Sequence, residues 1–206
     1  MTAGRKSHWE DVYGSKRHTD VSWYQEVPDK SLALINATGI STEDAIIDIG
    51  GGASTLVDHL LEAGYADVSV LDLASTAFDQ ARKRLGKQAG MVNWLVSDVT
   101  QFEPERQYRL WHDRAVLHFL TAASDRARYV EVLKDALMPG GHAVIATFGP
   151  DGPLKCSGLE IRRYSVSMLE ELLGPEFEVQ SHELENHQTP MGSTQQFLYS
   201  CWTRRG

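Results

Sequence analysis

The sequence predicts an α/β fold in which a mainly parallel β-sheet is covered by helices on both faces. Short apolar runs alternate with amphipathic stretches along most of the chain, and glycines stand where several of these segments end. This alternation favours parallel strands joined by crossover helices. No repeat or low-complexity linker divides the 206 residues, of which 42% are hydrophobic, so one domain over residues 1–206 is expected.

The elements follow in order along the chain. Helices at residues 7–13 and 28–38 come first, and we expect residues 1–44 to form a helical lid over the carboxyl end of the sheet. The apolar run at 45–49 is typical of a buried strand, because three glycines end it. Further strands are expected at 68–73, 92–96, 109–113 and 142–148, with helices at 54–63, 75–85 and 125–137 between them.

The pattern changes after Phe148. A loop rich in glycine and proline leads to a short helix at 165–173, and two strand-like segments follow at 177–184 and 195–202 with no helix between them. Such neighbours are expected to pair as an antiparallel hairpin at the edge of the sheet.

Composition excludes several classes of protein. The chain carries 20 Lys and Arg against 28 Asp and Glu, a net charge of −8, which disfavours nucleic acid and anionic membranes as partners. No apolar stretch reaches the length of a membrane span, and the polar start has no signal-peptide core, so a cytoplasmic location is expected. Cys156 and Cys201 form no metal-binding motif, and neither a disulfide framework nor a metal site is expected.

A glycine triplet carries the first functional signal. Gly50, Gly51 and Gly52 directly follow the first strand, where glycine lets a ligand approach the backbone at the start of a helix. Asp72 ends the second strand about 20 residues further on, which is where a carboxylate accepts ribose hydroxyls. Together they indicate an adenosine ligand, the alternative being a plain βα turn with Asp72 as a surface residue or a helix cap.

Asp48 helps to distinguish a dinucleotide from a sulfonium nucleoside as the adenosine ligand. A carboxylate just before the glycines opposes a pyrophosphate but suits a ligand that carries an ammonium group and a sulfonium. Thr55 replaces the third glycine of the dinucleotide fingerprint, and no Tyr-x-x-x-Lys pair is present. A sulfonium nucleoside is therefore favoured over the two alternatives, an NAD(P)-dependent Rossmann oxidoreductase and a non-catalytic nucleoside-binding module.

The motifs at 47–52, 71–72, 97–98 and 137–141 together resemble the class I S-adenosylmethionine-dependent methyltransferases, and the resemblance spans nearly the whole chain. It implies a Rossmann-like, seven-stranded sheet in the order 3-2-1-4-5-7-6, with strand 7 antiparallel. It further implies cofactor-binding βα units at 45–148 and a substrate-side loop and terminal hairpin at 149–206. The cofactor would be S-adenosyl-L-methionine and the product S-adenosyl-L-homocysteine.

The resemblance also assigns cofactor contacts. Gly50 and Gly52 would pass under the methionine part, Asp72 would bind the ribose, and Asp98 with Val99 would meet the adenine. Aromatic faces attract sulfonium, so Trp9 and Tyr24 of the lid are expected at the cofactor, although Trp9, Tyr13, Trp23 and Tyr24 also suit helix packing. The expected cofactor-binding residues are Trp9, Tyr24, Asp48, Gly50, Gly51, Gly52, Asp72, Leu73, Asp98, Val99 and Asp113.

Three residues are candidates for binding or activating the methyl acceptor. His118, after the fourth strand, is a candidate general base, and Arg114 is placed to hold a substrate carboxylate. The alternatives are a turn capped by Asp113 and a packed His118. Arg163, in the late loop, is a further candidate for binding an acidic substrate, its alternative being a solvated charge.

The expected reaction is in-line transfer of a methyl group to a small molecule or to a side chain of another protein. The fourth strand is not followed by the Asn/Asp-Pro-Pro-aromatic tetrad that marks amino-group methylation of adenine or glutamine. The sequence leaves the acceptor, the methylated atom and the oligomeric state open.

Overall fold

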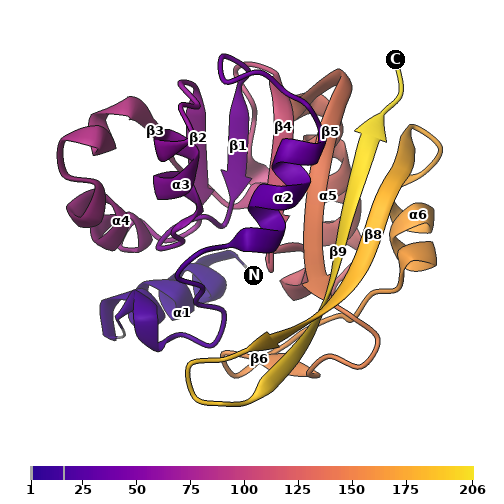
Figure 1. Ribbon diagram of the computed structural model, residues 1–206. Helices are drawn as coiled ribbons and strands as arrows, with labels where there is room; N and C mark the ends of the chain where they lie inside the picture. The colour runs from indigo at the N-terminus through magenta and orange to yellow at the C-terminus, as the bar shows by residue number, and fades with distance from the viewer. Residues whose placement is uncertain (1, 16) are drawn as a thin grey trace.

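The computed structural model describes residues 2–15 and 17–206, and its centre is a seven-stranded sheet between two layers of helices (Figure 1). The strand order is β3-β2-β1-β4-β5-β9-β8, and β9 pairs antiparallel with both neighbours while the other pairs are parallel. With β8 and β9 as the sixth and seventh strands, the predicted order 3-2-1-4-5-7-6 is confirmed.

The sheet is built from β1 (Ile46–Ile49), β2 (Val68–Asp72), β3 (Val92–Val96), β4 (Tyr108–Arg114), β5 (Leu137–Phe148), β8 (Phe177–Gln188) and β9 (Thr194–Arg204). The α-helices are α1 (Thr2–Ser15), α2 (Asp29–Ala37), α3 (Leu56–Glu62), α4 (Ala77–Leu85), α5 (Ala123–Ala136) and α6 (Val166–Leu173). Short 3-10 turns are η1 (His18–Asp20), η2 (Gly86–Met91), η3 (Val99–Gln101) and η4 (Leu117–Phe119). None of the helices in the described part of the chain is both long enough and apolar enough to cross a membrane.

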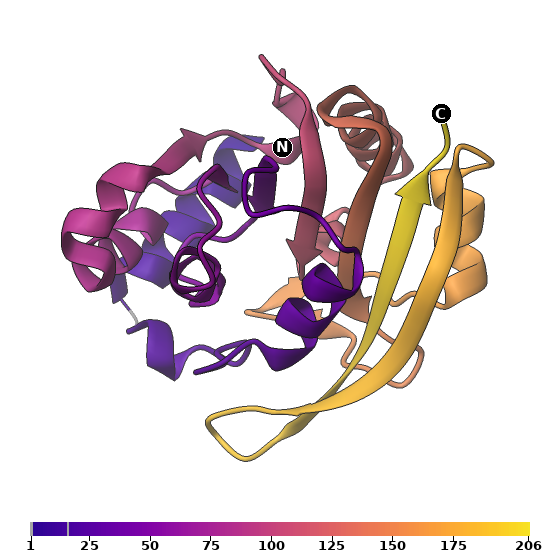
Figure 2. The same ribbon diagram turned by 45° about the horizontal axis from the view of Figure 1, so that its top comes forward.

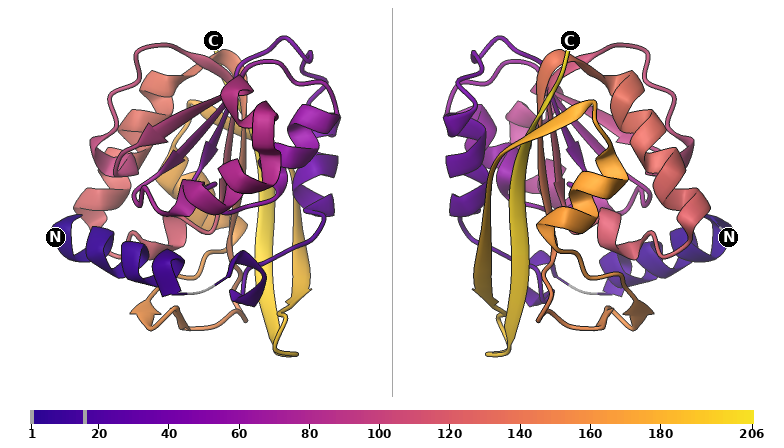
Figure 3. Two further views of the ribbon diagram at one scale, coloured as in Figure 1. Left: turned by 90° about the vertical axis from the view of Figure 1, so that its left-hand side faces the viewer. Right: turned by 90° about the vertical axis from the view of Figure 1, so that its right-hand side faces the viewer.

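Each face of the sheet has its own apolar core. Helices α5 and α6 cover one face, and α2, α3 and α4 cover the other (Figure 3). Because successive strand residues point to opposite faces, Ile47 joins the first core and Ile46 the second. Burial of side chains of this size contributes about 1.5–3 kcal/mol each to stability.

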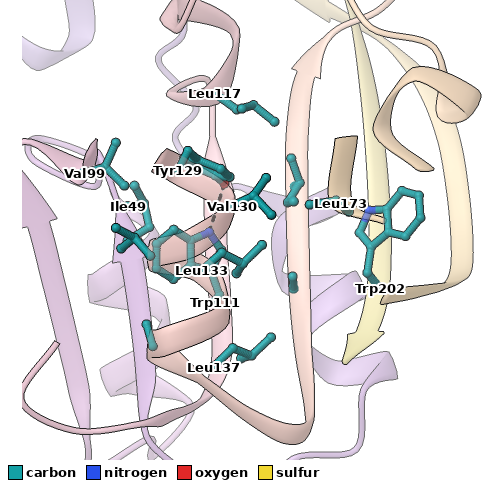
Figure 4. Close-up of a cluster of buried hydrophobic side chains, with 14 of the residues drawn as sticks. Ile49, Val99, Trp111, Leu117, Tyr129, Val130, Leu133, Leu137, Leu173 and Trp202 are labelled. Carbon is teal, nitrogen blue, oxygen red and sulfur yellow. Dashed lines mark hydrogen bonds between the residues drawn. The ribbon is translucent and has the colours of Figure 1, made fainter. Parts of the chain in front are cut away.

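The first core contains a polar link between the sheet and α5. Nε1–H of Trp111 donates to the hydroxyl oxygen of Tyr129 at 3.0 Å (Figure 4). Both rings are fully buried and pack edge to face, 5.6 Å apart. A buried indole N–H needs such a partner, so this bond fixes α5 against β4 and the turn that follows it.

Three segments gather at the carboxyl ends of the parallel strands. These are α1, the tip of the β8–β9 hairpin and a small hairpin formed by β6 (Lys155–Cys156) and β7 (Leu159–Glu160) (Figures 1 and 2). A lid over residues 1–44 was expected, and α2, which belongs to that segment, packs along one face of the sheet. Its Ile35 is fully buried in the second core, because the apolar side of α2 packs on the face of the sheet.

Two local features differ from the prediction. The strand expected to begin at residue 142 in fact begins at Leu137, which already pairs with Tyr108 before the register shifts, so residues 139–141 belong to β5. Gly140, with φ 75°, accommodates this irregularity without breaking the strand. The β6–β7 hairpin was not predicted, and its turn residues Ser157 and Gly158 both have positive φ, as tight hairpin turns require.

Candidate cofactor and acceptor site

A pocket lies between the carboxyl ends of β1, β2 and β4 and the helix α1. Its walls come from the turns after β1 to β4 and from residues 5–31. Most of the residues expected at the cofactor line it, namely Trp9, Tyr24, Asp48, Gly50, Gly51, Asp72, Leu73, Asp98 and Val99, and Arg114 lines it too. The fold therefore brings together residues that are far apart in the sequence.

The glycine turn leaves no room for side chains. Gly50 has φ 67°, and a Cβ there would lie 2.2 Å from Cγ2 of Val116. A Cβ on Gly51 would lie 2.2 Å from Oδ2 of Asp48. Gly52 does not line the pocket, but a Cβ there would lie 2.5 Å from Oδ2 of Asp72, so it lets the turn pack against that carboxylate.

Asp72 offers a buried carboxylate to the pocket. Its exposed fraction is 5%, and its Oδ1 accepts the N–H of Ala74 at 2.9 Å. Burial raises the pKa of Asp72 to about 7, while backbone N–H groups of Ala74 and Leu73 partly oppose the rise. A ligand hydroxyl that donates to this carboxylate would supply the solvation that burial removes.

Asp98 presents an acceptor atom that its surroundings leave open. Oδ1 accepts from the N–H and the hydroxyl of Thr100, at 2.9 and 2.7 Å. Oδ2 is buried and makes no hydrogen bond with any residue that the structure describes, although Nη2 of Arg5 lies 3.7 Å away. A buried acceptor of this kind at a pocket wall fits a ligand that supplies an N–H group.

Asp48 belongs to a buried chain of hydrogen bonds that the sequence did not predict. Its Oδ1 lies 2.6 Å from Nδ1 of His112, and Nε2 of His112 lies 2.9 Å from Oγ of Ser31. A carboxylate only accepts, so Nδ1–H donates to Asp48; in a neutral imidazole Nε2 then accepts from the Ser31 hydroxyl. All three residues line the pocket, and the chain connects β1 and β4 to α2.

Helix α1 is attached over the pocket by a carboxylate and by aromatic rings. Glu10 accepts hydrogen bonds from the backbone N–H and hydroxyl groups of Ser75 and Thr76, just before α4. The ring of Trp9 packs edge to face on Trp23 and Phe119, with centroids 5.7 and 5.1 Å apart. These contacts make α1 a wall of the pocket.

Asp113, like Gly52, does not line the pocket, although both were expected at the cofactor. Its Oδ1 accepts the N–H of Val116, and its Oδ2 accepts from Leu117 N–H and Tyr129 O–H. Burial raises its pKa to about 6, and the Tyr129 hydrogen bond is the largest effect against that rise. Asp113 therefore caps the turn after β4 instead of meeting the cofactor.

His118 is fully buried in η4 and has no surface in the pocket. Its ring stacks on Phe148 with centroids 4.5 Å apart, and its Nδ1 accepts the N–H of Phe148 at 3.2 Å. Burial, assisted by the charge of Arg114, lowers the pKa of His118 to about 3. This geometry is that of a packed neutral imidazole, and it corrects the expectation of a general base.

Arg163 also lies outside the pocket. Its side chain is exposed, and its Nη1 donates to the carbonyl of Gly152 at 3.3 Å. The expected contact with substrate is therefore corrected to a contact within the loop after β5.

The pocket wall also contains residues that were not among the expected site residues, including Arg5, Trp23, Ser31, His112 and Phe119. His112 carries a usable signal, because it lies two residues before Arg114 and alternate strand residues share a face. Arg5 and Ser31 reach the pocket from helices before β1, and no local pattern predicts where those helices pack.

Comparison with known proteins agrees with this geometry. Residues 46–141 match the family model described as a methyltransferase domain. Nodulation protein S of Rhizobium tropici is 35% identical over 80 residues, which make up 39% of this chain and 33% of that protein. The eEF1A lysine and N-terminal methyltransferase of Mus musculus is 25% identical over 115 residues, 55% of this chain and 16% of that protein. The chain thus spans a third or less of the length of these two relatives.

A solved structure shows the same fold over almost the whole chain. The N-methyltransferase NodS from Bradyrhizobium japonicum, in complex with S-adenosyl-L-homocysteine, superposes with a TM-score of 0.72 at 15% identity, covering 96% of this chain and 98% of that chain. The strand order, the glycine turn and the match of residues 46–141 to the methyltransferase-domain model together support the predicted resemblance to the class I S-adenosylmethionine-dependent methyltransferases.

Proposed function

We propose that this protein transfers a methyl group from S-adenosyl-L-methionine to an acceptor by in-line displacement. The observation that carries the proposal is the pairing of two buried carboxylates with the glycine turn in one pocket. Asp72 and Asp98 line the pocket on the β2 and β3 side of that turn. Oδ2 of Asp98 makes no hydrogen bond with any described residue, and both carboxylates can accept hydrogen bonds from a ligand. A nucleoside presents hydroxyl and N–H donors of the kind that these oxygens lack.

The residues present fit the cofactor part by part. The backbone of Gly50 and Gly51 would pass under its methionine part, and Oδ2 of Asp48 would accept from the ammonium group. Asp72 would take the ribose hydroxyls, and Asp98 the adenine amino group. Trp9, Tyr24, Leu73 and Val99 would complete the apolar walls, with aromatic faces toward the sulfonium.

The bound cofactor would supply both the activated methyl group and the leaving group. The chain itself would contribute alignment of the reacting atoms and exclusion of water, which lower the barrier by several kcal/mol. Helix α1, held by Glu10 and the Trp9 ring, would close the pocket for this purpose. His118 takes no part in the proposed step.

We further propose that the acceptor is a small molecule or a protein side chain. One relative is named as a methyltransferase of lysine and N-termini, and one fold neighbour as an N-methyltransferase. The net charge of −8 supports acceptors other than nucleic acid. Two buried free cysteines, Cys156 and Cys201, support a reducing compartment such as the cytoplasm.

The proposal is tested by titration calorimetry with S-adenosyl-L-homocysteine, NADH and NADPH, with EDTA present and absent. We expect binding of the homocysteine nucleoside alone, without any effect of EDTA. Transfer of label from methyl-labelled cofactor into cell extract then reveals the acceptor. Tight binding of NADH or NADPH would favour the oxidoreductase alternative, and nucleoside binding without methyl transfer would favour the binding module.

A further inference from the structure

Arg114 ends β4 and lines the pocket, and its guanidinium is held by residues outside the turns that carry Asp72 and Asp98. Nε–H donates to the hydroxyl oxygen of Tyr199 on β9 at 2.8 Å, and Nη1–H donates to the carbonyl of Trp23 at 2.8 Å. Strand β5 separates β4 from β9, whereas β1 and β2 lie on the opposite side of β4 (Figure 1). In strand order, the hydrogen-bond partner of the guanidinium on β9 therefore lies on one side of β4, and Asp72 and Asp98, at the ends of β2 and β3, lie on the other side.

This guanidinium lacks a direct counter-charge. Among the residues that the structure describes, no carboxylate lies within 4.0 Å of it, and its Nη2 is buried without a hydrogen-bond partner. Glu185 on β8 has a longer-range electrostatic interaction with the guanidinium. Oε2 of Glu185 is itself buried and has no hydrogen-bond partner among the described residues. A partly buried cation with an N–H group that lacks an acceptor costs free energy, and a ligand oxygen that accepts from this N–H would remove that cost.

The guanidinium is held in a fixed plane. Its central carbon lies 4.7 Å from the centre of the Phe197 ring, a cation–π contact. The next residue, Ala115, has φ 77°, a left-handed conformation that costs a non-glycine residue free energy. Its N–H donates to the Ala146 carbonyl at 2.8 Å, which fixes this turn against β5. The free Nη2 is thus positioned in advance of any ligand.

Aromatic rings adjoin the guanidinium in the same pocket. The Trp23 carbonyl accepts from Arg114, and the Trp23 ring contacts Trp9, which in turn contacts Phe119. All three rings line the pocket. Flat apolar surfaces of this kind suit a planar molecule, since aromatic groups pack well edge to face or offset.

We propose that Arg114, Trp9, Trp23 and Phe119 form an acceptor subsite for a planar aromatic acid, whose carboxylate pairs with Nη2 of Arg114. The inference rests on the proposed methyl transfer and names the class of its acceptor. Carboxylate is also present in the methionine part of the cofactor, so the experiment has to separate the two sources.

The test uses 2-naphthoate and its neutral isostere 2-naphthamide as probes, titrated into protein saturated with S-adenosyl-L-homocysteine. We expect the acid to bind roughly tenfold to hundredfold more tightly than the amide. Arg114→Gln should abolish that preference, and Arg114→Lys should restore much of it. Arg205→Gln, which removes a half-exposed positive charge near the C-terminus, should leave it unchanged.

A second arm compares S-adenosyl-L-homocysteine with 5′-methylthioadenosine, which lacks the amino-acid part. If Arg114→Gln weakens the binding of S-adenosyl-L-homocysteine but not that of 5′-methylthioadenosine, Arg114 holds the cofactor carboxylate, and the proposed acceptor subsite is wrong. Equal binding of acid and amide to the unchanged protein, or no binding of the acid, overturns it without any variant. Loss of nucleoside binding by the unchanged protein would instead overturn the proposed function.

Discussion

The carboxylate of Asp48 serves two neighbours at once: Oδ1 accepts from Nδ1 of His112 at 2.6 Å, while Oδ2 lies against the backbone of Gly51. Through Ser31, which bonds to the other nitrogen of His112, this single side chain connects the glycine turn to α2. The turn is therefore supported by side-chain contacts from three elements, which favours a pocket that is formed before the ligand arrives.

Asp48→Asn should separate these two roles. The amide oxygen can still accept from His112, but the negative charge for the ligand's ammonium group is lost. We expect the affinity for S-adenosyl-L-homocysteine to fall about tenfold, since a charge-assisted hydrogen bond becomes a neutral one. Affinity for 5′-methylthioadenosine should not change, and calorimetry with both nucleosides checks this. An equal loss for both would show that the charge does not act on the amino-acid part.

Asp72→Asn should weaken the cofactor and stabilise the free protein. Affinity for S-adenosyl-L-homocysteine should drop about tenfold to a hundredfold with loss of the charged acceptor. Because burial raises the folded-state pKa of Asp72 to about 7 from 3.8, its neutral form is favoured by folding. Stability from this group is complete below pH 3.8 and is lost as pH rises to 7. The variant without ligand should therefore melt at a higher temperature than the parent at pH 8.

The same carboxylate predicts a pH dependence of binding. Ribose hydroxyls donate to the ionised form, so nucleoside affinity should decline as pH falls from about 8 to about 6 through the pKa of Asp72, near 7. The Asp72→Asn protein should lose this part of the dependence. A parent affinity that stays constant across this range would contradict the assignment of Asp72 to the ribose.

Gly51→Ala tests the close approach at the turn. The added Cβ would lie 2.2 Å from Oδ2 of Asp48, which must then move. Overpacking of this kind costs about 1–3 kcal/mol, and nucleoside affinity should fall with the displaced carboxylate. Gly90→Ala is the matched control, because nothing lies within 4 Å of a Cβ there. Equal melting temperatures and affinities for both variants would mean that the turn tolerates a side chain.

Glu10→Ala should release α1 from the pocket. The helix loses its hydrogen bonds to Ser75 and Thr76, so amide exchange in residues 2–15 should accelerate and nucleoside affinity should fall several-fold. Asp11→Ala changes an exposed carboxylate on the same helix and should do neither. The hydrogen bonds also lower the pKa of Glu10, so the attachment should weaken as pH falls below 4.5. Unchanged exchange in Glu10→Ala would show that the aromatic contacts suffice.

His118→Ala should reduce stability without a specific loss of rate. Removal of the buried ring leaves a cavity beside Phe148 and an unpaired N–H, at a cost of about 2–4 kcal/mol. Once an acceptor is known, single-turnover transfer by the folded variant should stay within a few-fold of the parent. A rate that drops a hundredfold or more with intact cofactor affinity would restore His118 as the general base.

The part of the pocket proposed to hold the nucleoside was predictable because the positions of its residues depend on strand ends. Asp48, Asp72 and Asp98 come at the carboxyl ends of parallel strands or just after them, and such ends meet at one edge of the sheet. The sequence pattern fixes these positions to within a residue. Tertiary packing has little freedom to move them.

The acceptor half was less predictable because it depends on side-chain direction and on packing between distant segments. His112, Asp113 and Arg114 are consecutive, and alternation sends the first and third into the pocket while Asp113 faces α5. Strand register alone could have excluded Asp113. The burial of His118 depends on the packing of η4 against the end of β5, where the N–H of Phe148 donates to Nδ1 of His118. No local sequence spacing predicts this contact between distant segments.

The origin of the pocket walls bears on how the proposed acceptor specificity could change. Residues 48–99 form one continuous stretch that supplies the carboxylates proposed to hold the nucleoside, whereas Trp23 and Arg114 come from two other parts of the chain. Tyr199, outside the pocket lining, holds Arg114 from a third part. Replacements at Trp23 or Arg114 can therefore reshape the proposed acceptor end while the carboxylates of residues 48–99 stay in place. Trp9 and Tyr24, by contrast, are proposed to contact the cofactor, so exchanging the whole N-terminal segment would change both ends of the pocket.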